Sequence, residues 1–78
     1  MAEDRDVHDF LRVIADLQGA SGVGEAEDVL IADRLGLPLE EVHDRLEAMA
    51  LEGHLYLKKE RGRGYRTWLS PEGEEMIA

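Results

Sequence analysis

The sequence contains no cysteine, which excludes disulfide bonds, cysteine-bound zinc sites and thiol nucleophiles. It also has no apolar run as long as a signal-peptide core or a membrane span, so we expect a soluble cytoplasmic protein without membrane contacts. Its 78 residues, of which 44% are hydrophobic, suffice for one small core. We therefore expect a single domain over residues 1–78, either a minimal protein or a domain excised from a longer chain.

Basic residues are scarce as well, and their distribution matters more than their number. The chain has 9 Lys and Arg residues against 18 Asp and Glu residues, a net charge of −9. Residues 1–54 hold fourteen acids and four bases, whereas residues 55–69 hold five bases and one acid. An acidic body repels nucleic acid at long range, but a local basic patch can still hold phosphate. The acidity could equally be a trait of a salt-adapted or high-GC proteome, unrelated to any ligand.

A first helix is predicted by one apolar stripe at helical spacing, made of Val7, Phe10, Leu11, Ile14 and Leu17. Asp4 or Asp6 suits its N-cap and Gly19 its end. Val13 lies off the stripe, where we expect a peripheral core contact. The glycine-rich segment 19–24 has no strand before it and no Lys-Ser/Thr after it, so it is interpreted as a connection that could hold a short strand at Val23.

The next segments have the order helix, tight turn, helix. A second helix is expected from about Glu25 to Leu35. Gly36 suits the left-handed position after a helix and Pro38 the first turn of the next one, which leaves the tight turn of a helix-turn-helix. The third helix has an apolar stripe and is expected to end at Gly53; the stripe consists of Val42, Leu46, Met49 and Ala50.

Alternating apolar and polar residues then predict a β-hairpin with strands over 55–60 and 65–69 and glycines between them. Alternation leaves the register open, and with it the question of which of Tyr56 and Trp68 faces the core. The sequence therefore predicts an α+β fold of the winged helix-turn-helix class. It would have a three-helix core, a two- or three-stranded β-wing and the start of a fourth helix.

Four segments carry a family resemblance: residues 31–38, 51–59, 61–66 and 69–73, read as IADRLGLP, LEGHLYLKK, RGRGYR and LSPEG. In this order and spacing they resemble the landmarks of winged-helix regulators of the MarR, PadR and ArsR kind, from about Ala26 to Gly73. In such regulators a segment like the last one ends the wing and opens a further helix. Dimerisation is usual among them, often through helices outside the minimal domain, so the resemblance also implies a homodimer.

The resemblance implies DNA binding and transcription regulation through two surfaces. The wing would contact phosphates with Lys58, Lys59, Arg61, Arg63 and Arg66. If all five did so, log affinity would fall with log salt at a slope of about −4 to −5. The third helix would present its surface to the groove with Glu40, Glu41, His43, Asp44, Arg45 and Glu47. Acids can accept hydrogen bonds from cytosine amino groups, but several acids together must pass close to phosphates that repel them.

The acidic third helix also supports a second hypothesis, a winged helix that docks a protein and binds no DNA. An acidic helix beside a basic wing is a dipolar surface suited to a basic protein partner or to self-association. A solvated helix face with no partner is the third alternative. Of these, we expect a nucleic-acid-binding regulatory module that relies on its wing, with protein docking through the third helix as the alternative.

Catalysis finds little support in the sequence, and we expect a non-enzyme without cofactor or metal. Three histidines, His8, His43 and His54, form no compact metal-ligand pattern, and no serine or threonine lies close to them in sequence. Glu40 and Glu41 point to different sides of a helix, so they do not make an acid–base pair.

Overall fold

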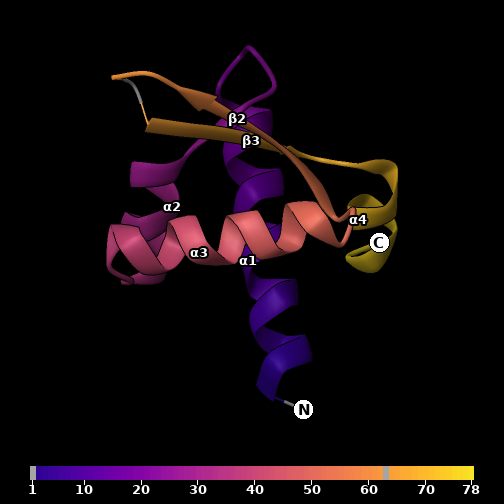
Figure 1. The fold of residues 1–78 in the computed structure, drawn as a ribbon. Coiled ribbons are helices and arrows are strands. Elements are labelled where there is room, and N and C mark those ends of the chain that lie inside the picture. The colour runs from indigo at the N-terminus through magenta and orange to yellow at the C-terminus, as the bar shows by residue number, and fades with distance from the viewer. Residues whose placement is uncertain (1, 63) are drawn as a thin grey trace.

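Three helices form most of the first two thirds of the chain in the computed structural model, which describes residues 2–62 and 64–78 and the side chains of residues 7–62 and 64–78. They are α1 (Ala2–Ala20), α2 (Asp28–Leu35) and α3 (Leu39–Leu51). α2 packs against both α1 and α3. In Figure 1, α3 crosses in front of α1, and the β2–β3 hairpin lies above the helices.

The turn between α2 and α3 has the predicted geometry. Gly36 adopts a left-handed conformation with φ of 68°, and its N–H donates to the carbonyl of Ala32. Leu37 N–H donates to the same carbonyl at 3.1 Å, which closes the end of α2. Pro38 occupies the N-cap position of α3, one residue earlier than expected. The fixed φ of proline and the freedom of glycine therefore produce a helix-turn-helix.

Three strands form one antiparallel sheet in the order β1-β3-β2. They are β1 (Ala26–Glu27), β2 (Leu55–Glu60) and β3 (Gly64–Leu69). The expected start of the second helix at Glu25 is wrong, and so is the strand at Val23. Ala26 and Glu27 are extended because they pair with Thr67 and Arg66 of β3, so the helix starts only at Asp28. That pairing is a long-range contact that helical periodicity does not contain.

The hairpin register settles the position of its two large aromatic residues. Leu55 pairs with Leu69 and Tyr56 with Trp68, which places both aromatic rings on the face away from the core, 5.9 Å apart. Leu55 and Leu69 lie on the opposite face and are buried. Neither Tyr56 nor Trp68 faces the core, because side chains alternate between the two faces of a strand.

The hydrophobic core lies between the helices and the inner face of the sheet. Its buried members are Phe10, Leu11, Ile14, Ala26, Ile31, Val42, Leu46, Met49, Leu55 and Leu69. The apolar stripe expected on α1 is confirmed, and Val13 packs at the edge of the core as a partly buried residue. In Figure 1 the hairpin extends beyond this core as a wing above α3.

The helices at the two ends of the chain follow the prediction in part. α1 begins at Ala2, ahead of Asp4 and Asp6, so neither of them is its N-cap, and Gly19 lies inside its last turn. The expected fourth helix is present as α4 (Pro71–Met76), where the Ser70 side chain accepts from the N–H of Gly73 as an N-cap. The chain therefore has an α+β fold with a winged-helix order of elements and a three-stranded sheet.

Candidate interaction surfaces of the third helix and the wing

Two basic side chains of the wing are paired with acids of the same sheet region. Lys58 Nζ lies 3.3 Å from Glu25 Oε2 and 3.9 Å from Glu60 Oε1. Arg66 lies 3.6 Å from Glu27 and 3.4 Å from Glu60. Both predicted phosphate contacts are therefore held by carboxylates of their own chain, and a phosphate would have to displace them.

The inner side of the wing is tied to α3 in the same way. Lys59 Nζ lies 3.4 Å from Glu47 Oε2 and 5.4 Å from the centre of the Tyr65 ring. Arg61 is exposed at the hairpin turn, and no ion pair to it is found among the side chains that the structure describes. Arg63, the fifth predicted contact, lies outside the described residues.

Asp28 is the most enclosed carboxylate of the site, with only 2% of its surface exposed. It lies at the first residue of α2, where a negative charge is favourable, and its oxygens accept three hydrogen bonds. His43 Nε2 of α3 donates at 2.6 Å, Tyr65 N–H of β3 at 2.9 Å and Val29 N–H at 2.7 Å. One carboxylate therefore joins both helices of the helix-turn-helix to the start of β3 in the wing.

The hydrogen bonds at Asp28 outweigh the effect of its burial on its acidity. Burial raises the pKa of Asp28, but the donors on Tyr65, His43 and Val29 together lower it, so that the pKa lies below its ordinary value. Gly64 makes room for this carboxylate. It has a φ of 79°, and a Cβ atom there would meet Asp28 Oδ2 at 2.8 Å.

His43 and Tyr65 continue the connection from Asp28 to the exposed edge of α3. Their rings are stacked with centroids 3.8 Å apart, and the Tyr65 hydroxyl donates to Glu47 at 2.9 Å. This hydrogen bond is the main reason that the pKa of Glu47 is lowered, followed by the hydrogen bond to Lys59, and it raises the pKa of Tyr65. His43 thus lies between α3 and the wing, while Glu47 holds both Tyr65 and Lys59.

The outer side of α3 carries the acids that have no such role. Glu40, Glu41 and Asp44 are exposed, and no described side chain forms an ion pair with any of them. The six residues predicted as one third-helix surface therefore divide into two groups. The three acids are exposed, with Glu41 at the border of a hollow beside Arg45, whereas His43, Arg45 and Glu47 contact other parts of the fold.

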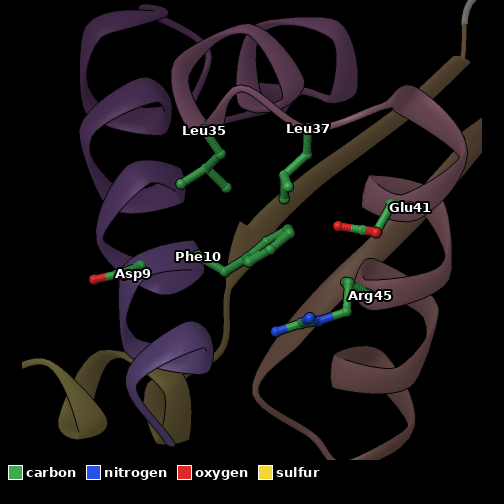
Figure 2. A pocket seen from close by; sticks show the side chains of 6 residues that line it. All are labelled: Asp9, Phe10, Leu35, Leu37, Glu41 and Arg45. Atoms are coloured by element: carbon green, nitrogen blue, oxygen red, sulfur yellow. The ribbon is translucent and has the colours of Figure 1, made fainter. Parts of the chain in front are cut away.

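Arg45 borders a small hollow of about 190 Å³ between α1, the α2–α3 turn and α3. Figure 2 shows Phe10, Leu35 and Leu37 around its apolar part, with Glu41 and Arg45 reaching in from α3. The guanidinium carbon of Arg45 lies 5.2 Å from the centre of the Phe10 ring, within the range of a cation–π interaction. The hollow is smaller than the roughly 300 Å³ at which small-molecule sites begin.

A second hollow, of about 270 Å³, lies between the C-terminal half of α3 and β2. Its apolar lining is formed by Ala50, Leu51 and Leu57, and its charged rim by Glu47 and Lys59. Leu51 is 90% exposed, although it belongs to a helix whose neighbouring turns supply the core. This is the most exposed large apolar side chain among the described residues.

Asp28 and Tyr65, the residues that join these surfaces, were not among the predicted site residues. Asp28 is separated from His43 by 15 residues and from Tyr65 by 37, so no local spacing marks the connection. The one available indication was the favourable place of an acid near the positive N-terminal end of the expected second helix, and that place does not distinguish a buried carboxylate from an exposed one.

In the described part of the chain, no three His, Cys, Asp or Glu side chains gather as a metal site, and no helix is long and apolar enough to span a bilayer. Comparison with known protein families, with curated proteins and with solved structures finds no match for this chain.

Proposed function

We propose that this chain is a winged-helix docking module that binds a basic segment of a partner protein through the outer side of α3. The observation that carries the proposal is the contrast between the two charged surfaces. Lys58, Lys59 and Arg66 on the wing are occupied by carboxylates of the same chain. The acids on the outer side of α3 are exposed and are not neutralised by any described side chain.

The same contrast argues against insertion of α3 into a DNA groove. A phosphate within about 4 Å of a carboxylate is repelled by about 1 kcal/mol even at the dielectric constant of water. Three exposed acids in the first turns of α3 would each meet this repulsion, and Arg45 is directed toward the Phe10 ring. A basic peptide would meet the opposite sign of charge at every one of these positions.

Nucleic-acid binding and regulation through the wing remain the second candidate, favoured by the exposed Arg61 at the hairpin turn. With the three paired bases left in their ion pairs, Arg61 and Arg63 remain as phosphate contacts. The expected salt slope is then no steeper than about −2, which is shallower than the −4 to −5 expected for five contacts. The slope therefore reports how many wing bases exchange a carboxylate for a phosphate.

The test is fluorescence anisotropy with a labelled lysine-rich helical peptide and with a mixed-sequence duplex DNA, each over a salt series. The informative variant is Glu40→Gln/Glu41→Gln/Asp44→Asn on α3. The matched control, Glu72→Gln/Glu74→Gln/Glu75→Gln, removes an equal number of negative charges from α4 and leaves α3 unchanged. We expect the α3 variant to bind the peptide about tenfold more weakly, because three exposed ion pairs contribute about 0.5 kcal/mol each.

The control variant should bind the peptide nearly as well as the unmodified chain. Equal weakening in both variants would mean that net charge, and not the α3 surface, attracts the peptide. Salt-sensitive DNA binding that is lost in Arg61→Ala/Arg63→Ala, together with no peptide binding, would replace the docking function with the nucleic-acid function.

A further inference from the structure

The sheet has an open edge at β2, because the strand order β1-β3-β2 leaves β2 paired on one side only. Two hydrogen bonds show which backbone groups face β3. Ser70 N–H donates to the His54 carbonyl, and the Thr67 hydroxyl donates to the Tyr56 carbonyl. In an antiparallel ladder the backbone N–H and C=O groups of successive residues point alternately toward the partner strand and away from it. The backbone groups of the even-numbered residues of β2 therefore point toward β3, and those of the odd-numbered residues point toward the open edge.

The outward-facing backbone groups belong to Leu55, Leu57 and Lys59. No backbone hydrogen bond outside the β2–β3 ladder involves them in the described part of the chain. Open edges are commonly protected by charged side chains, and Lys58 and Lys59 stand on this one. Both lysines, however, are paired with acids of their own chain, which weakens this protection.

Apolar surface lies directly beside the open edge. The hollow of about 270 Å³ between α3 and β2 is lined by Ala50, Leu51 and Leu57, and the Leu51 side chain is 90% exposed at its border. Tyr56, on the outer face of the same strand, is half exposed. An added strand would therefore gain backbone hydrogen bonds along the edge and apolar contacts on both sides of it.

We propose that the occupant of this edge is the β2 strand of a second copy of the chain, antiparallel about a twofold axis at Leu57. The axis position follows from strand overlap and charge, because among axes on a residue only those at Leu57 and Lys58 pair five of the six residues of β2 with the other copy. Outward backbone groups require odd-numbered residues to face odd-numbered ones. Axes at Lys58 or Lys59 would place a lysine directly opposite its own copy, which is destabilising.

The axis at Leu57 avoids every like-charge pair. Leu57 then faces Leu57 of the other copy, Tyr56 faces Lys58, and Leu55 faces Lys59. Just beyond these pairs, His54 faces Glu60, a neutral or attractive combination. Because the interface is isologous, each favourable pair occurs twice. The two three-stranded sheets join into one, and the exposed Leu51 side chains lie beside the new strand pair.

The chain offers a clean test of this register because it contains no cysteine. In Leu57→Cys, the two thiols would lie on directly opposed residues with Cα atoms about 5.5 Å apart, within the range of a disulfide. In Lys59→Cys, the two thiols would be four residue spacings apart, about 13 Å, too far for a bond. We expect oxidation to cross-link the first variant efficiently and the second poorly, with circular dichroism confirming that both are folded.

Sedimentation equilibrium up to about 1 mM protein measures the association itself. Leu51→Glu should weaken the dimer about tenfold or more, because burial of a leucine side chain is lost at an exposed position that folding does not need. Val23→Glu is its matched control, since Val23 is an exposed apolar residue of the loop before β1. Each copy carries a charge of −9, so added salt should tighten the dimer, whereas salt should weaken peptide docking on α3.

Three results would overturn the proposal. The unmodified chain could stay monomeric throughout the concentration range, which would leave the edge to an extended segment of another protein. Lys59→Cys could cross-link as readily as Leu57→Cys, which would mean association without this register. Finally, Leu51→Glu and Val23→Glu could leave association equally unchanged, which would place the interface elsewhere. None of these results depends on whether the peptide binds α3.

Discussion

We expect the substitution Asp28→Asn to remove about 2 kcal/mol from the free energy of unfolding. Asp28 accepts from three N–H donors on His43, Tyr65 and Val29, and it is 2% exposed. Asparagine has the same shape but only one acceptor oxygen, so at least one of these donors loses its acceptor. A buried donor without an acceptor costs about 1–3 kcal/mol.

This loss is large for a chain of this size. A domain of 78 residues has a total stability of about 4–12 kcal/mol at about 0.05–0.15 kcal/mol per residue. At about 4–8 °C per kcal/mol, the melting temperature should fall by about 8–16 °C. The assay is thermal and urea unfolding followed by circular dichroism. Asp33→Asn, on the exposed side of the same helix, is the control and should leave the melting temperature nearly unchanged.

The pH dependence gives an independent check with a definite sign. The pKa of Asp28 is lower in the folded chain than in the unfolded chain. Its contribution to stability is therefore fully present above its unfolded pKa, near 3.8, and is lost as pH falls toward its folded pKa. The stability gap between the unmodified chain and Asp28→Asn should narrow over this acidic range. An equal melting temperature for the two chains at neutral pH would refute the role assigned to Asp28.

Two further predictions concern other contacts. Gly73→Ala should destabilise the chain by about 1–3 kcal/mol, because its Cβ atom would overlap the His54 carbonyl, whereas Gly19→Ala in α1 should be neutral or stabilising. Unfolding in urea measures both, and equal effects would contradict the close approach at Gly73. Tyr65→Phe should raise the pKa of Glu47 toward its ordinary value, because the Tyr65 hydroxyl is the main cause of its lowering. Titration of the Glu47 carboxyl group by NMR tests this, and an unchanged pKa would assign the effect to Lys59.

Local sequence patterns predict correctly those elements that depend on the properties of single residues or on contacts between near neighbours in the sequence. The α2–α3 turn depends on the left-handed conformation of Gly36 and on the fixed φ of Pro38, both properties of single residues. The hairpin strands depend on alternation, and the fourth helix on the Ser70 cap. These features predict the winged-helix order of elements without knowledge of any distant contact.

Other features of the fold depend on pairing between distant residues. β1 exists because Ala26 and Glu27 reach β3, and this pairing shortened the second helix from its expected start. The hairpin register, which alternation alone leaves open, turned both Tyr56 and Trp68 away from the core. A strand pairing is a contact across the chain, so one segment read by itself cannot specify it.

In the candidate site, too, some properties follow from the sequence alone and others only from the tertiary structure. The sequence by itself determined the signs and rough places of the charges: an acidic third helix and a basic hairpin. Only the tertiary structure decided which charges are available to a partner. It paired Lys58, Lys59 and Arg66 with Glu25, Glu47 and Glu27, left the outer acids of α3 exposed, and buried Asp28 under His43 and Tyr65. The physical reason is that an ion pair or a buried hydrogen bond requires two groups within about 4 Å, and folding alone brings such distant residues together.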